Sequence, residues 1–104
     1  GGGSSDTIAA AGGDGGGGTG GAGGATAGTN GTANTGGGGG GSTPLALPSG
    51  TGGSGVVIIR YPDAYSISET TSGGNVLSFT TIPDGSDKVT TFTSGESGTI
   101  QFST

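Results

Sequence analysis

Several residue types on which protein chemistry depends are missing from this chain or scarce in it. It contains no Cys and no His, so disulfide frameworks, thiol chemistry and Cys/His zinc sites are excluded. Charged residues make up 9% of the chain, with 2 cations against 7 anions. Nucleic-acid binding needs a basic footprint, which this balance does not supply. With 4 prolines and no strict glycine triplet, the chain is not a collagen.

Long apolar runs are also absent. The longest is Val56–Ile59, far short of the roughly 20 residues that a membrane-spanning helix requires, so we expect no membrane insertion. The sequence shows no signal-peptide h-region. Because the chain begins with Gly1 and not with Met, we expect it to be part of a longer protein.

Glycine is the residue that the chain has in excess. It accounts for 30 of 104 residues, and most of these lie in positions 1–55. The only large apolar side chains there are Ile8, Leu45 and Leu47, whereas Val, Ile, Phe and Tyr become frequent in positions 56–104. We therefore divide the chain into a glycine-rich segment, 1–55, and a small β domain, 56–104.

The second half predicts an all-β, antiparallel fold. No window repeats apolar residues at helical spacing, so we expect almost no helix. Val56–Tyr61 is a continuous apolar and β-branched run, which favours a strand buried on both faces. Further strands are predicted at Tyr65–Ser68, Val76–Ile82, Lys88–Thr93 and Thr99–Ser103.

Turn signals separate the predicted strands. Ser72–Asn75 is one, and Pro83–Gly85 is another, because Pro presets φ, Asp bonds its own backbone and Gly accepts a positive φ. Ser94–Gly98 predicts a hairpin loop between the last two strands. The three Phe residues fall at inward-facing positions, which leaves Tyr65 as the aromatic side chain expected at the surface.

Two interpretations of the glycine-rich half are open. Glycine-rich chains can behave as flexible linkers. Alternatively the half is ordered, either irregularly or as threefold helices of the polyproline II type. Such helices have no internal hydrogen bonds, so their backbone groups must find partners in neighbouring segments. Without Cβ atoms, those segments can approach closely enough, and we expect the ordered form.

No constellation of residues indicates catalysis, a cofactor or a metal site. Gly15–Gly20 matches G-x-G-x-x-G only because any glycine run does, without the flanking strand and helix. Glu69 and Glu96 form no convincing glycosidase pair, because a chain with so little core offers no deep cleft. Asp84 and Asp87 fit a solvated turn better than a calcium loop. We expect no enzyme activity.

The small β domain is poor in large side chains. A single core of this size rarely supplies more than about 3–5 kcal/mol of stability. Other copies of the chain or a larger host protein would supply the missing burial. We expect a homotrimer, with strands closing around a threefold axis.

A familiar string joins the two halves. Gly52–Pro62 reads G-G-S-G-V-V-I-I-R-Y-P, and a glycine-rich tract ending in it resembles glycine-rich domain proteins of bacteriophage tail fibres and other virion appendages. Lys88–Thr93 with Gly98–Phe102 is similar to the β-hairpin that accompanies this tract in those proteins. The resemblance covers most of residues 12–104. It implies a structural virion protein that acts in host-surface attachment.

The same resemblance implies other virion proteins and a host glycan or protein receptor as partners. We expect receptor contact on exposed loops, with these candidate residues: Asn30, Asn34, Leu45, Leu47, Tyr65 and Glu96. The alternative is a secreted glycine-rich matrix or ice-binding protein. Ice binding predicts a flat, regular array of Thr, for which Thr29, Thr32 and Thr35 are few.

Overall fold

The chain forms two compact units, Gly1–Gly55 and Val56–Thr104, which are described separately. The computed structural model describes residues 1–5, 7–43, 47–70, 76–95 and 98–104. The described residues contain no helix, and all five β-strands lie in the second unit. The expected all-β fold is therefore confirmed.

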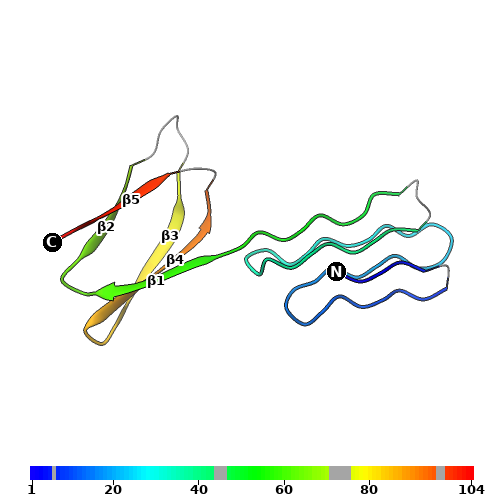
Figure 1. Cartoon of the computed structure of the whole chain (residues 1–104), viewed down its shortest axis with the longest axis horizontal. Coiled ribbons are helices and arrows are strands. Elements are labelled where there is room, and N and C mark those ends of the chain that lie inside the picture. The colour runs from blue at the N-terminus through cyan, green and yellow to red at the C-terminus, as the bar shows by residue number, and fades with distance from the viewer. Residues whose placement is uncertain (6, 44–46, 71–75, 96–97) are drawn as a thin grey trace. The chain divides into compact units, whose positions relative to one another are not determined.

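The strands of the second unit form two antiparallel sheets. The first has the order β1-β4-β3, with β1 at Val57–Pro62, β4 at Asp87–Ser94 and β3 at Ser78–Asp84. The second pairs β2 at Ser66–Thr70 with β5 at Thr99–Ser103. Figure 1 shows the two sheets as separate groups of strands within this unit.

The turn between β3 and β4 forms as its sequence predicts. Asp84 pairs with Asp87 at the end of the ladder, and Gly85 takes a φ of 64°. Glycine enters this left-handed region without strain because it has no Cβ. The predicted turn at 72–75 lies outside the described residues.

Two expectations about the strands are wrong. Val57 is 59% exposed and Ile58 is 62% exposed, so β1 is not buried on both faces. The reason is that β1 is an edge strand with only one face against the interior. β4 and β5 also do not form a hairpin, because they belong to different sheets. β5 instead contributes Ile100 to an apolar cavity that Val57 also lines.

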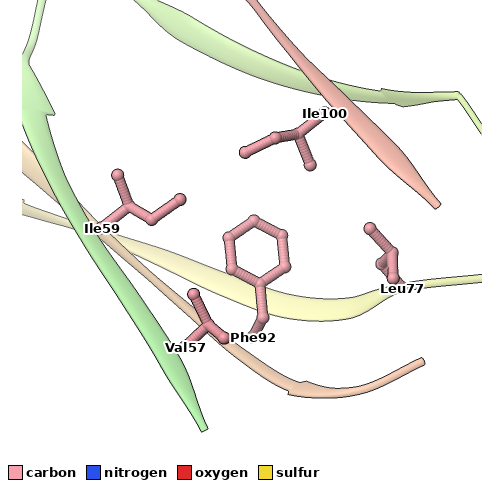
Figure 2. A pocket seen from close by; sticks show the side chains of 5 residues that line it. All are labelled: Val57, Ile59, Leu77, Phe92 and Ile100. Carbon is pink, nitrogen blue, oxygen red and sulfur yellow. The ribbon is translucent and has the colours of Figure 1, made fainter. Parts of the chain in front are cut away.

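The interior of this unit is small and incompletely filled. Among the described residues, the buried large hydrophobic side chains are Tyr61 and Phe92. Figure 2 shows Val57, Ile59, Phe92, Leu77 and Ile100 gathered around a cavity of about 220 Å³. The ring centroids of Tyr61 and Phe102 lie 5.2 Å apart in an edge-to-face contact. Phe102 is nevertheless 43% exposed, so the expectation that all three Phe residues face inward is wrong for this one.

The glycine-rich unit consists of runs that reverse at turns and lie side by side (Figure 1). Lateral backbone hydrogen bonds join them at a spacing of three residues. The Gly18 N–H donates to the Gly38 carbonyl and, three residues later, the Gly21 N–H donates to the Gly41 carbonyl, each at 2.8 Å. A three-residue repeat is that of the polyproline II helix. The runs occupy residues 1–5, 8–13, 16–22, 26–32, 36–43 and 49–55.

The run 36–43 has bonded neighbours on several sides. Its N–H groups donate to Thr29 and Gly2, while its carbonyls accept from runs 16–22 and 49–55. A Cβ added at Gly40 would collide with the carbonyl oxygen of Thr19. The backbone packed around this run therefore requires glycine at Gly37, Gly39 and Gly40, where an added Cβ would collide with it.

The interior of the glycine-rich unit contains no large side chain. Every buried residue among its described positions is a glycine, and these are Gly2, Gly18, Gly20, Gly21 and Gly40. Backbone groups thus take the place that apolar side chains hold in an ordinary core. Buried peptide groups are tolerated because they are hydrogen-bonded to one another.

Candidate functional site: the turn end of the glycine-rich unit

Turns from three parts of the sequence meet at one end of the glycine-rich unit. Ser5 bridges Ala22, and Thr26 bridges Thr43, which places the first turn beside the second and the second beside the third. Thr26 Oγ1 also donates to the Ala22 carbonyl at 2.6 Å. We call this group, made of residues 5–9, 22–26 and 42–48, the turn end; residues 6 and 44–46 within it are not described.

Ile8 is the large apolar side chain displayed there. Its side chain is 73% exposed, although its backbone is held on both sides. Ser5 Oγ donates to the Ile8 carbonyl at 2.7 Å and accepts from the Ile8 N–H at 3.0 Å. The turn is therefore fixed by its backbone, and the side chain remains free to contact another molecule.

Leu47 lies on the third turn and is half-buried. Its carbonyl accepts a hydrogen bond of 2.6 Å from Ser42 Oγ. The expected contact residue Leu45 lies outside the described part of the chain. The turn end thus joins a sequence candidate, Leu47, to a residue that the sequence did not single out, Ile8.

Asn30 and Asn34 have a different role. Asn30 Oδ1 accepts the Thr51 N–H at 2.9 Å, and the neighbouring Gly31 N–H donates to the Thr51 carbonyl, also at 2.9 Å. Asn34, with a φ of 63°, receives a hydrogen bond of 3.3 Å from Ser54 Oγ on its Oδ1. Both side chains therefore bind the run 49–55, Asn30 from run 26–32 and Asn34 from the residues that follow it, and both residues remain exposed.

Tyr65 belongs to the other unit. It is 40% exposed, as the sequence predicts for a surface aromatic, and lines an apolar groove with Tyr61, Pro62 and Phe102. Its carbonyl accepts a hydrogen bond of 2.7 Å from Lys88 Nζ. Glu96 lies outside the described residues. The described candidates are thus divided between the units, with Asn30, Asn34 and Leu47 in the first and Tyr65 in the second.

Arg60 forms the ion pairs found among the described residues of the β unit. Arg60 donates to Asp87 at 2.7 Å and to Asp84 at 2.5 Å. These two carboxylates raise the pKa of the Arg60 guanidinium above its ordinary value. Glu69 Oε2 accepts the Leu77 N–H at 2.9 Å. Among the described residues, no group of His, Cys, Asp and Glu is arranged to hold a metal ion.

A short repeat in the sequence could have revealed the order of the glycine-rich unit. Residues 26–31 read T-A-G-T-N-G, which puts Gly28 and Gly31 at the same phase of a threefold helix. A Cβ at either position would collide with backbone of another run. Peripheral runs therefore need glycine at one position in three, whereas the enclosed run 36–43 needs it more densely.

No protein-family model, curated protein or solved structure matches this chain. Within the described ranges, no helix has the length and apolar character needed to cross a bilayer.

Proposed function

We propose that this chain is a structural module of a bacteriophage virion appendage and acts as an oligomer in host-surface attachment. Two observations carry the proposal. The buried residues of the glycine-rich unit are glycines joined by lateral backbone hydrogen bonds, and the apolar side chain of Ile8 is exposed while Ser5 holds its backbone. The resemblance of Gly52–Pro62 to appendage proteins supplies the biological context.

Hydrogen-bonded runs behind the contact residues suit attachment, because ordering a binding segment on contact lowers affinity. The runs behind the turns are fixed by backbone bonds, so little conformational freedom is left to lose. Turn residues are also the positions at which a glycine lattice tolerates side chains. Variation there would change the partner without disturbing the interior.

The alternative, ice binding, needs free hydroxyl groups in a regular array. Thr26, Thr29, Thr32 and Thr35 do recur every three residues. However, Thr26 Oγ1 and Thr35 Oγ1 donate to carbonyls of the chain, and Thr29 Oγ1 accepts the Thr19 N–H at 2.7 Å. These contacts favour a scaffold role for the Thr stripe.

Two measurements test the proposed function. Antibody raised against the chain should label an appendage of phage particles from the source sample in immunogold electron microscopy. The purified chain should also bind host cells and compete with phage adsorption. Labelling of an extracellular filament without particles, or thermal hysteresis in chain solutions, would instead support the matrix or ice-binding alternative and overturn the proposal.

A further inference from the structure

The β2–β5 sheet has only two strands. Among the described residues, neither strand has a second hydrogen-bonded neighbour. A two-stranded sheet is at best marginally stable in water, and independent stability generally takes three strands or more, or a helix packed on the sheet. The β2–β5 sheet contacts the first sheet through Phe102 and Tyr61, but among the described residues each of its strands keeps one edge that could accept a further strand.

The edges of the other sheet are protected against strand addition. β1 contains Arg60 and Pro62, and β3 contains Pro83 together with a register irregularity at Ser78. Prolines, charges and irregularities are the usual devices that prevent edge-to-edge pairing. β5, with the sequence T-I-Q-F-S, has none of them.

β5 is also symmetrical about its central residue. Ile100 and Phe102 flank Gln101 and project to the same face, because side chains alternate along a strand. Ile100 lines the interior cavity, while Phe102 contacts Tyr61 and is still 43% exposed. The opposite face of β5 carries the exposed polar residues Thr99, Gln101 and Ser103.

We propose that β5 pairs antiparallel with β5 of a second copy of this chain, around a twofold axis at Gln101. Ile100 of each copy then lies opposite Phe102 of the other, an aromatic–β-branched pair of the kind that stabilises sheets. The two sheets join into one of four strands, with Ile67, Ile100 and Phe102 of both copies on its inner face.

We identify the added strand as β5 of a second copy because the free edge of β5 is complementary to itself. A twofold axis gives an isologous contact, in which the same patch serves both partners. The pairing also covers Phe102, which the chain alone leaves partly exposed. This inference rests on the self-association in the proposed function, replaces the threefold axis expected from the sequence by a twofold one, and is independent of attachment.

A charge-swap experiment on the 104-residue chain tests the pairing. Sedimentation velocity should give the wild type a mass of twice 9.4 kDa. Gln101→Lys and Gln101→Glu each place like charges opposite each other across the axis, and each should raise the dimer Kd by about fivefold. Mixing the two variants should restore dimerisation, because opposite charges then face each other.

Ser68→Lys is the matched control. Ser68 pairs with Gln101 within the chain and carries an exposed side chain on the same polar face, but it lies one strand away from the proposed axis. It should leave the dimer Kd unchanged. A second measurement uses Gln101→Cys: in a chain without native Cys, oxidation should produce a covalent dimer that Ser68→Cys does not give.

The outcomes separate this inference from the proposed function. A wild-type mass of one copy or of three copies would overturn the β5 pairing. A dimer that responds equally to Ser68→Lys, or that mixing of the variants does not restore, would overturn it as well. None of these results bears on labelling of a virion or on competition with phage adsorption, which test attachment.

Discussion

The hydroxyl groups of Tyr61 and Thr90 lie 2.8 Å apart in the most buried part of the β unit. Thr90 has no exposed surface, and its Oγ1 also lies 2.7 Å from Thr81 Oγ1. One hydroxyl at the centre of the sheet therefore links β1, β4 and β3. Each such hydrogen bond contributes modestly to stability, but removing one partner is costly because it leaves the other buried without a hydrogen bond.

Thr90→Val should lower the free energy of unfolding of the β unit by about 1–3 kcal/mol. The substitution keeps the shape of the side chain and leaves two hydroxyls without their shared partner. Urea unfolding followed by tyrosine fluorescence measures the change, because both tyrosines lie in this unit and the chain contains no Trp. Thr91→Val, on the opposite face, is the control and should change little.

The hydroxyl cluster also predicts coupling. In a double-mutant cycle, Tyr61→Phe combined with Thr90→Val should cost less than the sum of the single variants, since removing both partners leaves fewer unsatisfied groups. Additive costs would show that the 2.8 Å contact contributes nothing specific.

Gly40→Ala should destabilise the glycine-rich unit by about 1–3 kcal/mol or more, because the new methyl group collides with backbone. At Gly13 a Cβ meets no atom within 4 Å, so Gly13→Ala should stabilise by about 0.4–1 kcal/mol through the unfolded state. Amide hydrogen exchange at Gly18 and Gly21 reports both effects. Equal protection in the two variants would contradict the packing of run 36–43.

Ile8→Ser should abolish or strongly reduce binding to host cells and leave stability unchanged, because the Ile8 side chain is mostly exposed. Asn30→Ala should do the reverse. It removes the acceptor of the Thr51 N–H and should cost about 0.5–1.5 kcal/mol, with binding retained. Cell-binding isotherms and thermal unfolding are measured on both variants. Loss of binding in Asn30→Ala alone would move the contact site away from the turn end.

Arg60→Gln should lower stability slightly at low salt, and about 1 M NaCl should remove the difference, because exposed ion pairs are screened. The carboxylates raise the pKa of Arg60 in the folded state. Its contribution is therefore complete below the unfolded pKa and is lost only as pH rises through the folded value. Between neutral pH and about pH 9 the difference between variant and wild type should stay constant.

Much of the fold could be predicted from local sequence. Thr99–Ser103 has the predicted bounds, and the Pro83–Gly85 turn closes the β3–β4 hairpin, because alternation and turn chemistry act between near neighbours. The partner of β5 was mispredicted because sheet pairing is decided by which apolar faces meet. The sequence between β4 and β5 is as compatible with a hairpin loop as with a connection between two sheets, so it does not reveal the partner of β5.

The candidate site was harder to predict. Asn30 and Asn34 look like free loop residues in the sequence, yet their side chains bind Thr51 and Ser54, some 20 positions away. Ile8 carries no motif, and its prominence comes from a backbone turn held by Ser5. Lateral contacts between glycine runs leave only a faint trace in the sequence, the T-x-G repeat of 26–31.

An interior made of peptide groups has an unusual thermodynamic consequence. Exposure of apolar surface raises the heat capacity on unfolding, whereas exposure of polar surface lowers it. Because the buried residues of the glycine-rich unit are glycines, its unfolding should carry a small heat-capacity change for its length. The free energy of unfolding should accordingly vary little with temperature. The unit should lose little stability on cooling, a condition that weakens cores held by the hydrophobic effect.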